Sequence, residues 1–478
     1  MSTPPLSLLN PSTAKRRFYG IILPTALAIG YGAIFAALSI LRHVTFRTQT
    51  WDLGIFEQSF WNTLQGNVMY NVFENANHLS VHFSPFLFTL VPIYAIAPGP
   101  TILLILQSLA VGGGAIPLYA MTRRWTNAGT AIVVACAYLL YPPLHWLTLF
   151  DFHEVAFAIP LFLVAFDQLD RGRWAVSATA LGLAASTAEN MILATAGVGL
   201  YIMITSRRHR RFGVWVLAGA AAYFVFTAAV LMPTLGGKIY RLDRYANLGQ
   251  TPAEMLSTIT QRPHRLLATI ATPEKFAYLA RLFAPLASLP LLAPTSLILL
   301  LPGMAQNLLT DYAPQFQNTY QYDAILIAFL FIGCALGWKK IGQRWSAALP
   351  ALRWIGLGAA VAAFLWWSPL GLRHYPWMQF RPDDRSKALS AIVRALPADA
   401  SIAAATNLVP HLTHRTDIWM AGTESIANPD IIILDLWDTT GFSSAENFQN
   451  YLASYQQKKY RSRLLEQRFL ILTRTDAF

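Results

Sequence analysis

Long apolar segments, separated by short basic clusters, are the feature that most constrains the fold of this chain. Hydrophobic residues make up 55% of its 478 residues and charged residues only 13%. The basic clusters lie at residues 15–17, 123–124, 171–173, 207–211 and 339–344. A helix needs about 20 apolar residues to cross a bilayer, and many of the segments approach this length. The sequence therefore predicts an all-α polytopic membrane protein.

The basic clusters also predict how the helices are oriented, because Lys and Arg are enriched in cytoplasmic loops. Between the clusters we expect about eleven crossings, near residues 18–40, 101–121, 129–148, 153–170, 174–188, 190–206, 212–232, 276–290, 292–309, 322–338 and 347–367. Residues 1–17 would be cytoplasmic, and the transmembrane domain 18–368 would have exterior loops at 41–83 and 233–275. These basic loops explain the 36 Lys and Arg against 24 Asp and Glu, so nucleic-acid binding is not expected.

The apolar segment 83–97 decides the number of crossings. About 15 residues of helix reach about 22 Å, which is short of the bilayer core of about 30 Å. We therefore expect a re-entrant or interfacial hairpin, closed by Pro98, Gly99 and Pro100. If the segment crosses instead, there are about twelve spans and the middle helices are inverted.

The last part of the chain, residues 369–478, has a soluble character. Helix-like stretches and short apolar strands alternate in it, at 385–396, 401–405, 431–436, 445–459 and 469–472. This pattern predicts a small extracytoplasmic α/β domain. Asp435 and Asp438 follow a strand, which is a common place for a site, but no glycine-rich phosphate loop accompanies them. We therefore favour acceptor recognition or a structural lid for this domain, with His411 and His414 at its surface.

In this orientation, separate exterior loops bring ionisable residues to one face of the membrane. Charged side chains beside a bilayer are costly and are therefore expected to be paired or functional. Candidates for contact with a substrate are Glu57, His78, His82, Asp151, His153, Lys238, Arg241 and Arg244. Glu154, in a short polar turn, and Glu189, between two short apolar segments, are candidates for catalysis.

Several of these residues also have a structural explanation. Asp52 could cap the helix that follows it, and the apolar spacing over 53–64 predicts that this helix lies on the membrane surface. His78 and His82 have the i, i+4 spacing of metal ligands, but no strong third ligand is nearby in the sequence. The cations at 238–244 could anchor lipid headgroups or bind a phosphate.

Several strings, spread over most of the chain, resemble the bacterial and archaeal membrane family called domain of unknown function 2079. They are DLGIFEQSFWNTLQGN, HLSVHFSPFLFTLVPIYAIAPGP, LLYPPLHWLTLFDFHEVAFAIPLFLVAFDQLDRGRW, LPGMAQNLLTDYAPQFQNTYQYDAI and LPADASIAAATNLVPHLTHRTDIW. That family in turn resembles the GT-C integral-membrane glycosyltransferases. The resemblance implies a GT-C-like fold in the bacterial plasma membrane.

The resemblance also implies an activity. GT-C enzymes transfer sugars from polyprenyl-phosphate donors on the outer face of the membrane, and their first exterior loop carries an acidic base or metal-associated carboxylate. Asp52 occupies the matching place. Where related chains tend to have a Tyr-His-Tyr-like element, this chain has Tyr320, Gln321 and Tyr322, so a catalytic imidazole does not transfer and the two tyrosines remain substrate-binding candidates.

The chemistry implied by the resemblance is an inverting substitution at the anomeric carbon. Asp52 would take the proton of an acceptor hydroxyl as the lipid phosphate leaves. Either cations of the 233–275 loop or a divalent ion, Mg²⁺ or Mn²⁺, bound by Asp52 and Glu154 would stabilise the leaving group. The expected partners are membrane lipids, a polyprenyl-phosphate-linked sugar donor, and a glycan, lipid or protein acceptor.

Two other classes of function remain open. A transporter or flippase of lipid-linked sugars would also place polar groups at broken helices, but on both faces of the membrane. A non-catalytic membrane scaffold would explain the C-terminal domain but leaves Asp52, Glu154 and Glu189 without a role.

Overall fold

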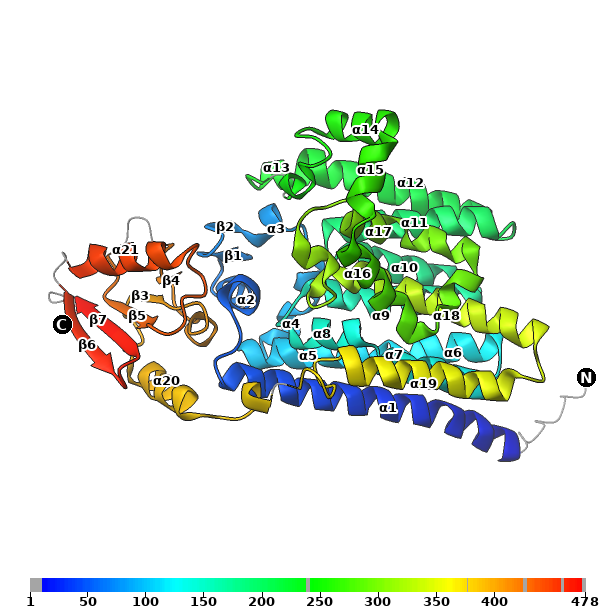
Figure 1. Ribbon diagram of the computed structural model, residues 1–478, viewed down its shortest axis with the longest axis horizontal. Helices are drawn as coiled ribbons and strands as arrows, with labels where there is room; N and C mark the ends of the chain where they lie inside the picture. Colours follow the sequence, from blue (N-terminus) through cyan, green and yellow to red (C-terminus); the bar gives the residue numbers. More distant parts are fainter. Residues whose placement is uncertain (1–10, 238–240, 376, 424–427, 457–459, 475–478) are drawn as a thin grey trace, which may run out of the picture.

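Apolar helices that lie side by side form the larger part of the molecule, and a small domain with a five-stranded sheet lies at one end (Figure 1). The computed structural model describes residues 11–478 except 238–240, 376, 424–427, 457–459 and 475–478. The largest buried apolar cluster lies within the helical part and joins residues from Ala28 to Phe380. The predicted all-α bundle with a small C-terminal α/β domain is therefore confirmed.

Five helical stretches in the described residues are long and apolar enough to cross a membrane. They are α1 (Pro11–Val44), α5 with α6 (Pro100–Gly113 and Ala115–Trp125), α12 with α13 (Arg210–Phe226 and Met232–Thr234), α18 (Ala324–Arg344) and α19 (Leu349–Trp367). A sixth is formed if α7 (Ala128–Leu139) and α8 (Pro142–Leu149), bent by 43° relative to each other, count as one span. Two further apolar helices, α10 (Trp174–Ala185) and α11 (Glu189–Thr205), are shorter.

These long spans are fewer than the predicted eleven or twelve, because several apolar segments are broken. The region 273–308 forms α16 (Pro273–Phe283), η6 (Ala284–Leu286), η7 (Leu289–Leu292), η8 (Pro294–Leu300) and α17 (Leu301–Leu308). Pro285, Pro290 and Pro294 lack the backbone N–H that a continuous helix needs. The predicted helix 153–170 likewise begins as a 3₁₀ turn, η3 (Glu154–Phe157), followed by α9 (Ala158–Asp170).

The segment 83–97 forms only two short helical turns. They are η2 (Pro85–Thr89) and α4 (Val91–Tyr94), and neither belongs to a helix long enough to cross a membrane. Gly99 then turns the chain into α5 with a φ of +147°, a value that glycine adopts without strain. The short turns agree with the hairpin expected from the length of this segment.

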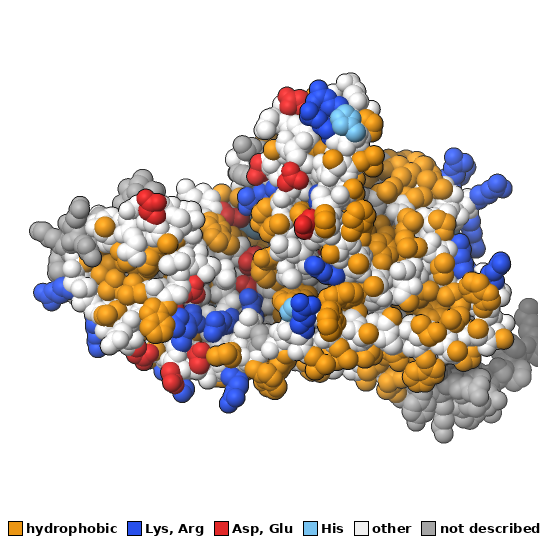
Figure 2. Space-filling view, in the orientation of Figure 1, with side chains coloured by type: hydrophobic (Ala, Val, Ile, Leu, Met, Phe, Trp, Pro, Cys, Tyr) orange, Lys and Arg blue, Asp and Glu red, His pale blue; other side chains and the backbone are white. Residues whose placement is uncertain are grey.

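The two ends of the bundle differ in charge. Figure 1 places the α11–α12 and α18–α19 turns at the end opposite the C-terminal domain. Figure 2 shows Lys and Arg side chains gathered at that end, and hydrophobic side chains over much of the bundle between the two ends. The basic clusters 207–211 and 339–344, which lie at these two turns, thus share one end of the molecule.

The first loop after α1 is folded onto the bundle. It contains η1 (Thr50–Gly54), α2 (Ile55–Leu64), β1 (Tyr70–Asn71), β2 (Ala76–Asn77) and α3 (His78–Val81). Leu53, Phe56 and Phe60 are buried in one cluster with Leu103 of α5 and with Phe152. The apolar face of this helix therefore packs against protein, and its place at the membrane surface stays a prediction.

The loop 233–275 is also tied to the bundle. Its elements are η5 (Leu242–Tyr245), α14 (Pro252–Gln261) and α15 (Pro263–Ile270). The buried ammonium of Lys275 donates to the backbone carbonyls of Thr269, Leu308 and Thr310, at 2.7–2.9 Å. These three bonds satisfy all the donors of the ammonium and join the loop to the segment after α17.

The C-terminal domain contains one mixed sheet with strand order β4-β3-β5-β7-β6. Its elements are α20 (Asp384–Ala395), β3 (Ile402–Ala404), η12 (Val409–His411), β4 (Ile418–Met420), β5 (Ile431–Asp435), α21 (Ala445–Gln456), β6 (Tyr460–Leu465) and β7 (Phe469–Arg474). β3 pairs in parallel with β4 and β5, whereas β7 is antiparallel to β5 and β6. The three predicted strands and both predicted helices are present, and β4 and β6 are additional.

The domain packs directly on the loop that follows α1. Phe46 belongs to the same buried cluster as Leu389 and Val409 of the domain. The hydroxyl of Thr50 donates to the carbonyl of Thr406 at 3.0 Å, and the Thr50 N–H donates to the Thr406 hydroxyl. The helical part and the C-terminal domain therefore meet through both apolar and polar contacts.

Asp435 and Asp438, at the end of β5, have structural partners. The buried Asp435 carboxylate accepts two hydrogen bonds from Arg468, both 2.7 Å, and one from Arg385 at 3.3 Å. Asp438 accepts from the side-chain amide of Asn407 at 3.1 Å. Arg385 also donates to the carbonyl of Phe46, so this strand end joins the domain to the bundle.

The contact between α11 and α12 depends on glycine. A methyl group at Gly199 would lie 2.5 Å from the backbone nitrogen of Leu217, whereas one at Gly219 would meet no atom within 4 Å. We expect Gly199→Ala to force the helices apart and destabilise the protein by about 1–3 kcal/mol. Gly219→Ala should be neutral or stabilising, because alanine favours the helix. Unfolding temperatures of the two variants in detergent test this, and equal temperatures would contradict the close helix contact.

Candidate functional site

Asp52 and His153 form the centre of a cluster of acids and imidazoles. Asp52 lies in η1, and His153 precedes η3, so the pair joins the first loop to the turn after α8. Nε2 of His153 donates to Oδ1 of Asp52 at 2.9 Å. Burial opposes protonation of the imidazole, but the hydrogen bond and charge of Asp52 outweigh burial and raise the pKa of His153. Asp52 is therefore a half-buried acid beside an imidazole whose protonation it favours.

Asp52 does not cap the helix that follows it. The residue at the N-cap of α2 is Gly54, and no side chain accepts a capping hydrogen bond at η1 or α2. The Asp52 carboxylate instead points to His153. Helix capping therefore does not explain why an acid stands at position 52, and the partner of this acid in the structure is the imidazole of His153.

The turn that carries His153 is clamped from two helices. Asp151 has a φ of +97°, which is unfavourable for a residue with a side chain. Its carboxylate accepts from the guanidinium of Arg42 and, at 2.9 Å, from the backbone N–H of Gln49. Gln107 of α5 donates to the carbonyl of Asp151 and accepts from the N–H of His153, both at 2.7 Å. These four contacts explain how the strained turn is maintained.

Asp151 thus positions the turn, and its carboxylate, predicted to contact substrate, is engaged by Arg42 and buried. Sequence reasoning did not select Gln107 or Arg42. Gln107 is a fully buried amide within an apolar helix, and that contrast was the available signal. An amide in such a place is expected to satisfy other buried polar groups.

Glu154 lies beside this pair with part of its carboxyl group unpaired. The residue is buried, and its Oε2 has no hydrogen-bond partner among the described residues. Burial raises the pKa of Glu154, while His78, His82 and His153 oppose this effect. Nε2 of His78 and Nδ1 of His153 are also buried without a described partner. Three unpaired polar atoms on neighbouring residues could bind the hydroxyls of a ligand.

His78 and His82 each pair with a carboxylate. Nδ1 of His78 lies 2.9 Å from Oε2 of Glu74, and Nδ1 of His82 lies 3.2 Å from Oε1 of Glu189. The N–H of Phe83 donates to the second oxygen of Glu189 at 3.2 Å. Glu189 is therefore a paired carboxylate, as its place between two apolar helices predicts.

These imidazoles do not form a ready metal site. The described residues contain no group of three or more His, Cys, Asp or Glu side chains arranged to bind a metal ion. Each of His78 and His82 already uses one ring nitrogen for a carboxylate. The divalent ion expected at Asp52 and Glu154 stays a prediction, and no step below depends on it.

Aromatic rings connect His153 to the cations of the 233–275 loop. The ring of Phe150 stacks on His153, with centroids 5.3 Å apart, and contacts Tyr320 at 4.9 Å. Tyr320 contacts Tyr322 at 6.4 Å, and the guanidinium of Arg244 lies 5.3 Å from the Tyr322 ring. A chain of successive ring contacts thus links His153 to the predicted residues Tyr320, Tyr322 and Arg244.

Two further cations of this loop were predicted to bind substrate. Arg241 is exposed, with a φ of +72° before η5, three residues from Arg244. Lys238 lies outside the described residues.

Glu57 is the predicted site residue that the structure places elsewhere. Its fully buried carboxylate accepts from Oη of Tyr94 at 2.5 Å, from Nε2 of His414 at 2.7 Å and from the hydroxyl of Thr413. It lies on a different face of the helix from Asp52 and joins the first loop to the C-terminal domain. His414, expected at the surface of the domain, is exposed, and its pairing with Glu57 raises the pKa of its imidazole.

The arrangement of the elements is that of a known class of membrane proteins. The structure is similar to ArnT from Cupriavidus metallidurans bound to undecaprenyl phosphate, with a TM-score of 0.54 and 10% sequence identity, over 94% of this chain and 98% of that one. The apo state of ArnT gives a TM-score of 0.49 and 12% identity, over 93% and 98% of the two chains. ArnT is a GT-C glycosyltransferase, so this chain has a GT-C-like membrane fold.

The family of the chain is shown by its sequence. Residues 42–468 match the family described as predicted membrane protein DUF2079, and the chain belongs to that family. No curated protein is detectably similar to the chain in sequence. At 10% identity, the likeness to ArnT shows the fold alone.

Replacing Gln107 should destabilise the clamped turn. Gln107→Leu leaves the carbonyl of Asp151 and the N–H of His153 without their partner, which costs about 1–3 kcal/mol. Ser108→Ala is the matched control, because the neighbouring hydroxyl donates only to Leu104 within its own helix. The apparent unfolding temperature should fall clearly for the first variant and little for the second. A similarly small change of the unfolding temperature in both variants would show that the hydrogen bonds of Gln107 do not stabilise the protein.

The pairing of His82 with Glu189 predicts a pH dependence of stability. Burial opposes the charged imidazole, but Glu189, Glu154 and Glu74 raise its pKa from 6.5 to about 9. The stabilisation is therefore fully present below about pH 6.5 and is lost as the pH rises through about 9.

Unfolding temperatures of the wild type and His82→Gln measure this effect between pH 6 and 10. The difference between them should be largest at pH 6 and shrink towards pH 10. His264→Gln, at an exposed position of α15, should show no such trend. A difference that is constant with pH would contradict the charged pair.

Proposed function

We propose that this protein transfers a sugar from a polyprenyl-phosphate donor to an acceptor at the outer face of the membrane. The observation that carries the proposal is the Asp52–His153 pair, placed in a fold that is shared with a protein solved with undecaprenyl phosphate bound. The acceptor would be a glycan, a lipid or a protein. The reaction would invert the configuration of the anomeric carbon.

In this mechanism Asp52 is the base. As the acceptor oxygen forms its bond to the anomeric carbon, its proton passes to the Asp52 carboxylate and the bond to the lipid phosphate breaks. The electron pair of that bond leaves with the phosphate oxygen. His153, with Nε2 2.9 Å from Oδ1 of Asp52, orients the carboxylate that receives the proton.

The neighbouring residues have separate roles in the proposal. Arg244 and Arg241 stabilise the charge that develops on the departing phosphate, because guanidinium groups bind phosphate oxygens with two parallel hydrogen bonds. The unpaired oxygen of Glu154 accepts from a sugar hydroxyl. Glu189 keeps His82 protonated, so that His82 adds a further cation near the donor.

The charge of the loops supports one orientation in the bacterial plasma membrane. Lys and Arg gather at the end of the bundle that is opposite the C-terminal domain (Figure 2). The positive-inside rule then makes the N-terminus cytoplasmic and the C-terminal domain extracytoplasmic. The Asp52–His153 pair would lie at the exterior end, where a lipid-linked donor and its acceptor can meet.

Replacing Asp52 tests the proposal. Membranes that contain the protein are supplied with undecaprenyl-phosphate-linked hexose and pentose donors, and the released undecaprenyl phosphate is measured. Asp52→Asn should lower the release by at least about a hundredfold, as expected for loss of a general base. Asp417→Asn, an exposed position in the C-terminal domain, should retain the wild-type rate.

Three outcomes would contradict the proposal. Full activity of Asp52→Asn would remove Asp52 from the mechanism. Movement of the intact donor across the membrane, without release of undecaprenyl phosphate, would support a transporter or flippase. A protein that does neither would be a scaffold.

A further inference from the structure

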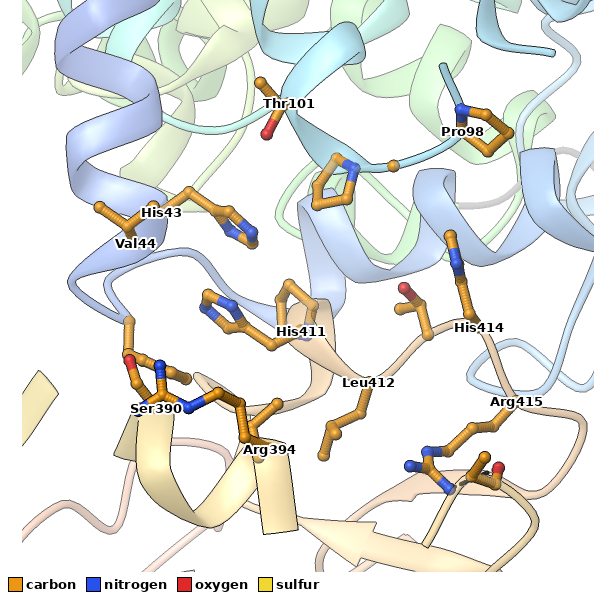
Figure 3. Close-up of a pocket in the computed structure, with 17 residues that line it drawn as sticks. His43, Val44, Pro98, Thr101, Ser390, Arg394, His411, Leu412, His414 and Arg415 are labelled. Carbon is orange, nitrogen blue, oxygen red and sulfur yellow. Dashed lines mark hydrogen bonds between the residues drawn. The ribbon is translucent and has the colours of Figure 1, made fainter. Parts of the chain in front are cut away.

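A cavity of about 730 Å³ lies where the C-terminal domain meets the ends of α1 and α5 (Figure 3). Its walls come from the last turn of α1, the start of α5, α20 and the segment 410–415. Neither Asp52 nor any other member of the acid and imidazole cluster lines it. The cavity is therefore separate from the proposed catalytic centre. Its volume is in the range of small-molecule sites, so it is large enough for a ligand.

The lining of this cavity is complementary to an anion. None of its 17 lining residues is Asp or Glu, and the set contains two arginines and three histidines. Arg415 already donates to the carbonyls of Pro397 and Ala398, and His414 is paired with Glu57. The carboxylate of Glu57, which contacts the lining residues Thr413 and His414, accepts hydrogen bonds from both and from Tyr94. Burial lowers the pKa of His411 and disfavours the charged form of His43, so Arg394 is the positive charge of this lining that is free to act on a ligand.

Two side chains and a helix end are available for that ligand. Arg394 is exposed, with no hydrogen bond or ion pair among the described residues, and Nε2 of His411 is buried without a described partner. Figure 3 shows His411 between His43 and Ser390, with Arg394 on the same wall. The 14-residue α5 begins at Pro100 in the cavity, and its N-cap Gly99 offers no capping side chain. Free N–H groups at a helix start attract phosphate.

The surroundings of the cavity identify the source of the anion. Val44 lines the cavity and is 43% exposed, and Ile96, two residues before the lining Pro98, is 84% exposed. Both lie at ends of apolar helices or turns, where the bilayer would meet water in the proposed orientation. A ligand here has its charged group in the cavity and apolar chains beside these residues. We propose that the cavity binds the phosphate headgroup of an anionic membrane lipid at the junction of the two domains.

Binding of lipids to the purified full-length protein tests this site. Native mass spectrometry measures retention of phosphatidylglycerol, with phosphatidylcholine as the zwitterionic comparison. The Arg394→Gln variant should weaken retention of phosphatidylglycerol about tenfold, as expected for loss of a charge-assisted contact to phosphate. Ser390→Asp, which places an acid in the cavity, should weaken it at least as much. Arg461→Gln, an exposed arginine of β6 outside the cavity, should leave retention unchanged.

The remaining outcomes decide against the proposal. Equal retention by the wild type and both cavity variants, with unchanged unfolding temperatures, would place the lipid elsewhere. A similar loss in Arg461→Gln would show a general effect of surface charge. Displacement of phosphatidylglycerol by millimolar inorganic phosphate would identify a site for soluble phosphate instead of a lipid headgroup.

Discussion

The strained turn at Asp151 is the contact on which the rest of the site depends. Arg42 at the end of α1 and Gln107 of α5 fix this turn from two sides. This turn places His153 within hydrogen-bond distance of Asp52, which lies in η1 at the start of the folded first loop. Since the C-terminal domain packs on that same loop, a short buried segment connects two membrane helices, the acid and imidazole cluster and the sheet domain.

Pairing of carboxylates with imidazoles makes this cluster tolerable next to a bilayer. A buried carboxylate or imidazole alone would lose its charge, because desolvation favours the neutral form. Here Asp52 faces His153, Glu74 faces His78 and Glu189 faces His82. Glu154 is the exception, because one of its oxygens has no described partner. A single unpaired acid among paired ones is the arrangement expected where a ligand completes the hydrogen bonds.

Much of the fold could be predicted from residue patterns, and the failures have physical causes. Apolar length and basic clusters located the helical segments, but the prolines at 285, 290 and 294 broke regions that were expected to span. Strand β5 is apolar and was found, whereas β4 has three residues and β6 is mostly exposed, so neither shows a clear pattern. Asp52, His153, Glu154, Glu189 and the two tyrosines were selected, but Glu57 was assigned to the wrong contact and Gln107 was missed. The pattern of apolar and polar residues indicates which polar side chains are costly to bury. It does not indicate which residue each of them contacts.

The amino-acid sequence alone determined the class of this protein, the ends of most helices and the loops that carry its ionisable residues. Those properties follow from the transfer of each segment between water and an apolar medium, which depends on local composition. Only the tertiary structure decided which acid meets which imidazole, because the partners are far apart in the chain. Asp52 and His153 are separated by 101 residues, and His82 and Glu189 by 107. The acids and imidazoles of the first loop therefore form one cluster through contacts with distant turns, and these contacts exist only after the helices have packed.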